Sequence, residues 1–165
     1  MVVLSFLVGG LSLLRPPLPV VSFLLPPAVS VVLSPGCRVG VVGSRSFPAV
    51  SLVRSFVAAL PAGCLVCSGA GGVVDLAARS AALSAWLGCL SFPAAWGRWG
   101  RSAGPRRSGV LVAAGLSCLC VFLSSPSAPS PGSAACVRLA LAAGVPVFVF
   151  GPGGFVGGFS QLSLF

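Results

Sequence analysis

Short apolar runs alternate along the middle of the chain with longer segments that end at glycine or proline. The apolar runs predict β-strands at residues 38–43, 64–68, 88–92, 117–122 and 145–150. The segments between them predict helices at residues 49–60, 74–86, 105–115 and 133–143. Strands that are apolar throughout are typical of parallel sheets covered on both faces. The predicted fold class is therefore α/β, with a Rossmann-like, doubly wound parallel sheet of about five strands and right-handed crossovers.

Composition divides the chain into three parts. Residues 1–36 form a proline-rich apolar extension, residues 37–150 the α/β domain, and residues 151–165 a glycine-rich tail. The extension is a poor membrane anchor, because Pro-Pro pairs interrupt it and a spanning helix needs about 20 apolar residues. It is also a poor signal peptide, since Arg15 follows the apolar stretch instead of preceding it. We therefore expect the extension to be dispensable for the fold of the domain.

The overall composition suggests a membrane protein at first, with 56% hydrophobic and 7% charged residues. However, the chain lacks Lys, Asn, Ile, Thr, Tyr, His and Glu, whose codons all contain adenine. Only Met1, Asp75 and Gln161 require an adenine, which indicates adenine-depleted coding. The net charge of +9 is therefore weaker evidence for nucleic-acid binding than it would normally be. We expect a cytoplasmic protein, and hydropathy keeps a membrane-associated protein as an alternative.

Seven cysteines are spread through the apolar runs, with no His or Glu to complete a metal site. Cys64 and Cys67 form a C-x-x-C, but they fall within a predicted strand and not at a turn before a helix. We expect buried structural thiols, with no metal site and no disulfide framework.

The first predicted strand ends in a turn suited to an anion. Gly43, Ser44 and Arg45 follow this strand, where a doubly wound sheet binds its ligands. The turn would offer backbone N–H groups, a hydroxyl and a guanidinium to a phosphate. The alternative is a helix cap followed by a solvated arginine.

The second predicted strand leads into a turn of small residues and then into Asp75, the only acid of the chain. Ser68, Gly69 and Gly71 would let the backbone approach a nucleotide, or would form a tight strand-to-helix turn and nothing more. Asp75 would accept a hydrogen bond from a ribose hydroxyl, or would orient Arg45 and the neighbouring loop. As an acid in the first turn of a helix it would contribute only about 0.3–1 kcal/mol.

The densest basic cluster follows the third predicted strand, with tryptophans interleaved. Tryptophan rings can stack on bases while guanidinium groups hold phosphates, and a solvated loop is the alternative. Further along, Gly132 and Ser133 open the last predicted helix, where the serine could donate to a phosphate. The candidate nucleic-acid residues in the basic cluster are Arg98, Trp99, Arg101, Arg106 and Arg107.

Four segments resemble motifs of the SLOG (Smf/DprA–LOG) superfamily, and most of all its YpsA-related phage and bacterial branch. They are VVGSRSF, CSGAGGVVDLAARSAA, AAWGRWGRSAGPRRSGVLVAAG and PGSAACVRLALAAGVPVFVF, in the family's order over residues 37–150. The resemblance implies a Rossmann-like domain for a nucleotide-derived ligand, with Gly104, Pro105 and Arg106 closing over it. Val73 stands where that family usually has a glycine, and Ser133 replaces a threonine.

The sequence favours binding over catalysis. No His, Lys, Glu or Tyr is present for proton transfer, and Cys136 occupies the position of the glutamate in the LOG motif. We expect a sensor or carrier of a nucleotide-like small molecule, with no certain cofactor and with a homo-oligomer left open. The alternative function is a single-stranded DNA-binding protein of the DprA type.

Overall fold

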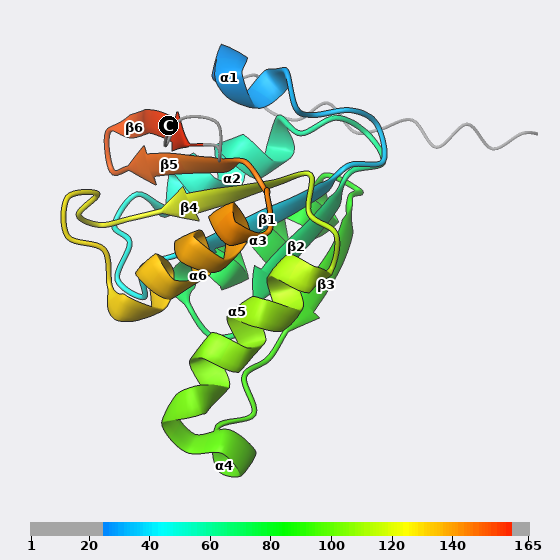
Figure 1. The fold of residues 1–165 in the computed structure, drawn as a ribbon. Helices are drawn as coiled ribbons and strands as arrows, with labels where there is room; N and C mark the ends of the chain where they lie inside the picture. The colour runs from blue at the N-terminus through cyan, green and yellow to red at the C-terminus, as the bar shows by residue number, and fades with distance from the viewer. Residues whose placement is uncertain (1–24, 160–165) are drawn as a thin grey trace, which may run out of the picture.

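Strands and helices alternate through the part of the chain that the computed structural model describes, residues 25–159 (Figure 1). The strands are β1 (Arg38–Gly43), β2 (Leu65–Gly69), β3 (Gly88–Phe92), β4 (Cys118–Phe122), β5 (Val147–Gly151) and β6 (Gly154–Phe159). The α-helices are α1 (Pro27–Ser30), α2 (Val50–Ala58), α3 (Val73–Ser84), α4 (Trp96–Trp99), α5 (Ala103–Ala113) and α6 (Pro131–Ala142). A short 3-10 helix, η1 (Gly100–Ser102), joins α4 to α5.

The strands form one sheet in the order β3-β2-β1-β4-β5-β6. The first five strands are parallel, and β6 pairs with β5 in the antiparallel sense. The chain leaves β1 for β2 and β3 on one side, and then crosses to β4 and β5 on the other. This topology confirms the predicted α/β, Rossmann-like fold, and it places the switch point between β1 and β4.

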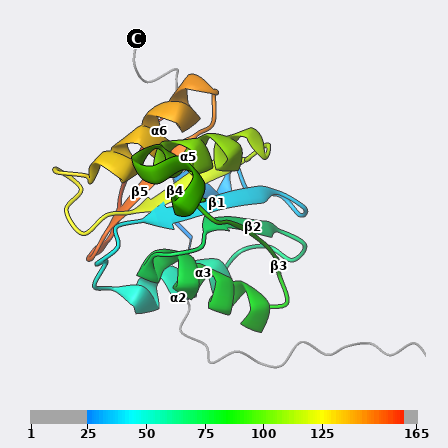
Figure 2. The same ribbon diagram turned by 90° about the horizontal axis from the view of Figure 1, so that it is seen from below.

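Helices cover both faces of the sheet (Figure 2). On one face α2 and α3 bury Val53, Phe56 and Ala78 against the strands. On the other face α5 and α6 bury Leu111 and Ala140. Strands β4 and β5 are buried along their whole length, which explains their continuous apolar runs.

A cluster of phenylalanines fixes the first of these two cores. The Phe122 and Phe150 rings, from neighbouring strands, stack with centroids 4.8 Å apart. Phe56 of α2 lies 5.6 Å from Phe122 and 5.2 Å from Phe150. Such aromatic pairs add about 0.5–1.5 kcal/mol each beyond the area they bury, so α2 is held firmly against β4 and β5.

The structure adds a sixth strand where the sequence analysis placed a glycine-rich tail. Residues 154–159 turn back on β5 through a hairpin, and Gly154 has a φ of +122° that favours glycine. The Phe155 ring packs 5.5 Å from the Phe150 ring, so this strand covers the edge of β5. The rest of the predicted tail, residues 160–165, lies outside the described residues.

Part of the proline-rich extension packs on the domain. Val29 in α1 is fully buried in the core formed by α2 and α3. Leu25, Val32 and Leu33 pack against the same core. Residues 1–24 of the extension lie outside the described residues, so the expectation that the whole extension is dispensable stays a prediction.

Two further findings bear on earlier expectations. The segment between β3 and α5, where the sequence analysis predicted neither helix nor strand before residue 105, holds the short helices α4 and η1. Within residues 25–159, no helix combines the length and the apolar character that crossing a membrane requires.

The packing of α1 can be tested by substituting a buried valine and, as a control, an exposed valine of the same segment. Val29→Ala removes two buried methyl groups, and we expect it to lower the free energy of unfolding by about 2 kcal/mol. Val31→Ala in the same segment is the control, because that side chain is 85% exposed. Urea unfolding of both variants measures the difference. Equal losses would show that α1 does not pack on the domain in solution.

Candidate functional site

The turn after β1 joins the two strands that flank the switch point. The Ser44 backbone N–H donates to the Phe122 carbonyl oxygen at 2.9 Å, and the Ser124 N–H donates to Ser44 Oγ at 3.1 Å. Gly43 permits this approach, since a Cβ at that position would overlap the Phe122 carbonyl oxygen. Gly43 and Ser44, predicted as ligand-binding residues, therefore already bond β1 to β4.

Asp75 caps its own helix. Its Oδ2 accepts the backbone N–H of Gly71 at 3.2 Å and that of Gly72 at 3.1 Å. These amides belong to the turn after β2, which was predicted to let the backbone approach a nucleotide. In this structure a carboxylate of the chain itself satisfies them, as an N3 acid does in a capping box.

The same carboxylate holds Arg107. Asp75 Oδ2 lies 3.8 Å from Arg107 Nη1, and the two side chains are 10% and 26% exposed. Gly69 makes room for this pair, because a Cβ there would overlap both the guanidinium and the carboxylate. The structure thus places Arg107 beside Asp75, where the sequence analysis had considered Arg45.

A groove of about 250 Å³ opens next to this ion pair. It lies between the carboxyl end of β3 and helix α5, at the same end of the sheet as the turns after β1 and β2. Its volume is just below the range of about 300–1,000 Å³ that is common for small-molecule sites. The groove is lined by Ser91, Phe92, Pro93, Ala95, Trp99, Ala103, Arg106, Arg107 and Val110.

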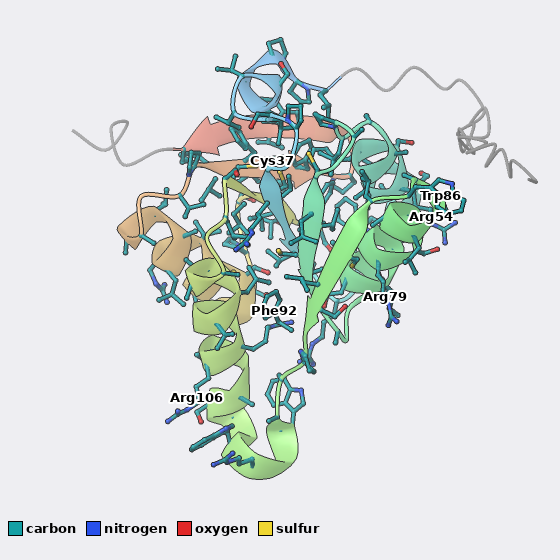
Figure 3. The ribbon with its side chains drawn as sticks, turned by 90° about the vertical axis from the view of Figure 1, so that its right-hand side faces the viewer. Cys37, Arg54, Arg79, Trp86, Phe92 and Arg106 are labelled. Atoms are coloured by element: carbon teal, nitrogen blue, oxygen red, sulfur yellow. The ribbon has the colours of Figure 1, made fainter. Side chains whose placement is uncertain are left out.

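Trp99 and Arg106 line the groove, and Arg98 lies against the same tryptophan from outside the groove lining. The Arg106 guanidinium lies 4.0 Å from the centroid of the Trp99 ring, and that of Arg98 lies 4.9 Å away. These are cation–π distances, so the tryptophan orients both cations. Arg106 is exposed, and Figure 3 shows it on α5, at the far end of the molecule from Cys37.

Trp96 connects two of the predicted site residues. The Arg45 guanidinium lies 6.0 Å from its ring. A Cβ on Gly104 would lie 3.4 Å from the same ring, so the tryptophan packs directly on this glycine. Arg45 therefore faces the segment after β3 rather than the turn that Asp75 caps.

The remaining predicted residues lie apart from the groove. Ser68 is fully buried, and its hydroxyl donates to the Gly69 carbonyl oxygen. Ser133 is also buried, and its hydroxyl accepts from Ser130, which is the N-cap of α6. Gly132 is exposed with open space around it. None of these residues lines the groove.

Beneath Arg107, helices α5 and α6 meet at two small polar side chains, Ser108 and Cys136. Both are buried, with 5% and 3% exposure. Burial raises the pKa of the Cys136 thiol, although the Ser108 hydroxyl and the Arg107 guanidinium oppose this rise. The thiol is therefore protonated near neutral pH and is a poor substitute for a catalytic carboxylate.

Sequence reasoning missed two residues that line the groove, Phe92 and Pro93. Phe92 ends β3 and Pro93 follows it, so the rule that singled out the ends of the first two strands would also have found them. Neither side chain carries a polar group, so a search for charged or hydrogen-bonding residues does not select them. Arg107 was assigned only to nucleic-acid binding, because the sequence does not show which arginine reaches Asp75.

Comparison of the chain with protein-family models, curated proteins and solved structures finds no match.

Gly69 tests the packing of the ion pair. Gly69→Ala should push Arg107 and Asp75 apart and lower the free energy of unfolding by about 1–3 kcal/mol, as overpacking usually does. Gly71→Ala is the matched control two residues away, because a Cβ there meets nothing within 4 Å. Thermal or urea unfolding compares the two. A neutral Gly69→Ala would mean that the Asp75–Arg107 contact does not persist in solution.

Asp75 tests the cap. Asp75→Ala leaves the Gly71 and Gly72 amides without their acceptor and Arg107 without its ion pair, and should cost about 1.5–3 kcal/mol of stability. Asp75→Asn keeps an amide oxygen for the backbone and should cost less. Urea unfolding of the two variants separates the contribution of the hydrogen bonds to the backbone amides from that of the negative charge. Equal losses would assign the whole effect to the charge.

Proposed function

We propose that the protein binds an anionic small molecule with an aromatic ring, a nucleotide or nucleotide derivative, in the groove between β3 and α5. The observation that carries this proposal is the lining of the groove, where apolar walls end in two neighbouring guanidinium groups. Phe92 and Val110 offer an apolar surface to a base, and Arg106 and Arg107 offer donors to a phosphate. The SLOG-like motifs of the sequence support the same class of ligand.

The two arginines have different parts in this proposal. Arg107 is held by Asp75, so its charge is partly compensated and its position is fixed. Arg106 rests on Trp99 and forms no ion pair among residues 25–159. Arg106 is therefore the principal phosphate-binding side chain, and Arg107 shapes the groove and adds a second donor.

Binding without turnover follows from the chemistry of the lining. The groove contains guanidinium groups, one serine hydroxyl and apolar side chains. The only acidic side chain of the sequence, Asp75, is engaged by two backbone amides and Arg107. A general acid or base is thus missing from the residues that line the groove, and we propose a sensor or carrier.

A second candidate function rests on the segment between β3 and α5. Helix α4 and the start of α5 extend beyond the edge of the sheet (Figure 1). Trp96 and Trp99 are 50% and 40% exposed there, and Arg98 and Arg101 are exposed beside them. Exposed aromatic rings among cations are suited to a single nucleic-acid strand.

Arg106→Gln tests the proposed site. We expect this variant to lose about ten- to hundredfold in affinity for nucleoside monophosphates, since a bond to a charged group is worth about 1.5–3 kcal/mol. The corresponding nucleosides should lose less, because they carry no phosphate. Calorimetry with the common nucleosides and their monophosphates measures both. Arg79→Gln is the matched control, because Arg79 is exposed on α3, away from Arg106 (Figure 3).

A single-stranded oligothymidylate separates the two functions. If the oligonucleotide binds along the segment between β3 and α5, its affinity should fall steeply as salt increases, because arginines that contact several phosphates release the counterions bound there. It should also weaken in Arg98→Gln, which lies outside the groove lining. Unchanged monophosphate affinity in Arg106→Gln would refute the proposed site.

A further inference from the structure

Two cysteines lie in contact at the end of the sheet opposite the groove. Cys37 comes just before β1, and Cys64 comes just before β2. Their Sγ atoms are 2.8 Å apart, closer than two non-bonded sulfur atoms normally approach. Figure 3 shows Cys37 at this end of the sheet, with Arg106 at the other.

The backbone brings the two residues into register. Arg38 of β1 is aligned with Leu65 of β2, so the preceding residues, Cys37 and Cys64, are also neighbours. The Leu65 N–H donates to the Cys37 carbonyl oxygen at 2.8 Å and extends the ladder to this position. Neighbouring strands are about 4.8 Å apart, which lies within the Cα separation that a disulfide tolerates.

The C-x-x-C of the sequence is not the pair that the structure forms. Cys64 lies in the core under α2 and α3, whereas Cys67 lies in the core under α5 and α6. Three residues along a strand place the two side chains on opposite faces of the sheet. Cys64 therefore faces Cys37, a residue 27 positions earlier in the chain.

We propose that Cys37 and Cys64 form a reversible disulfide when the protein meets a low-molecular-weight disulfide such as oxidised glutathione. The Cys37 thiolate attacks one sulfur of the reagent, forms a mixed disulfide and releases one glutathione thiol. The Cys64 thiolate then attacks Cys37 Sγ and releases the second glutathione. The two protein thiols give up two electrons and two protons, and the oxidant is reduced to two thiols.

The order of these steps follows from the surroundings of each thiol. Cys37 is 5% exposed and Cys64 is fully buried, so the reagent reaches Cys37 first. Burial, together with the contact to Cys37, raises the pKa of Cys64 to about 12. Cys64 is thus protonated near neutral pH, so it does not react with the reagent itself and must lose its proton before it attacks the Cys37 sulfur that lies beside it.

The bond would link the residue before β1 to the residue before β2, next to the stretch that leads from α1. Cys64 Sγ also lies 3.6 Å from the Ser34 carbonyl oxygen, in the stretch that links α1 to β1. In the reduced protein, burial of Val29 and its apolar neighbours holds this stretch. Oxidation would add a covalent link at Cys37 and would remove the S–H that Cys64 donates to the Ser34 carbonyl oxygen, so both changes fall beside this stretch.

The test is peptide mapping of the oxidised protein. The reduced full chain is incubated with oxidised glutathione without denaturant, alkylated and digested with trypsin. We expect a cross-linked product of the peptide that ends at Arg38 and the peptide 55–79, lighter by two hydrogens than the reduced pair. Cys67→Ser is the matched control, because it removes the other cysteine of peptide 55–79 and should leave the product unchanged.

Further measurements decide the proposal. Cys64→Ala and Cys37→Ala should each abolish the product, and dithiothreitol should reverse it in the wild type. Closing a loop of this length should raise the melting temperature by about 5–10 °C in the oxidised form. The proposal is overturned if Cys37 stops at the mixed disulfide with glutathione. It is equally overturned if the Cys64→Ala variant still cross-links to peptide 55–79.

Discussion

The carboxyl end of the sheet depends on a single carboxylate oxygen. Asp75 Oδ2 accepts hydrogen bonds from two backbone amides and forms an ion pair with the Arg107 guanidinium. It therefore fixes both the start of α3 and the position of α5. In a chain with one acid and a net charge of +9, no other side chain can do this. Gly69 is part of the same arrangement, since any side chain there would occupy the space in which the two charges meet.

The unusual composition of the chain is compatible with its fold because the interior of a parallel sheet can be built almost entirely from apolar side chains. Its strands need apolar side chains on both faces, and Val, Leu, Phe and Cys supply them here. The buried polar side chains among residues 25–159 are few, namely Ser68, Asp75, Ser108 and Ser133. A sequence almost without Asp, Glu or Lys can therefore still form a doubly wound domain, in which the arginines of residues 25–159 are exposed or, like Arg107, half-buried.

The two ends of the sheet carry different chemistry. The carboxyl end has the groove, the arginines and the tryptophans, and the amino end has the Cys37–Cys64 contact. The length of the strands separates these features, so a variant at one end leaves the direct contacts of the other intact. Only the amino end involves α1, which links the behaviour of the thiol pair to the packing of the proline-rich segment.

The sequence by itself determined the layers of this protein. Runs of apolar residues and their glycine and proline stops are local features, and they predicted the five parallel strands and their four crossover helices to within two residues. Strand β6 escaped this reasoning because glycines dilute its apolar pattern, and its pairing with β5 is a contact between segments. Helix α1 was not predicted because the neighbouring prolines argue against a helix, and nothing in the local pattern shows that Val29 is buried.

Tertiary structure alone decided the partners of the side chains. The sequence placed Arg45, Asp75 and Ser133 after the carboxyl ends of the strands, but only the packing of α5 on the domain selects Arg107 for Asp75. Likewise, the C-x-x-C spacing of Cys64 and Cys67 predicted only buried structural thiols, whereas strand register places Cys64 beside Cys37. The physical reason is the same in both cases: periodicity along a chain fixes which face a residue occupies, but the neighbour across that face comes from another strand or helix.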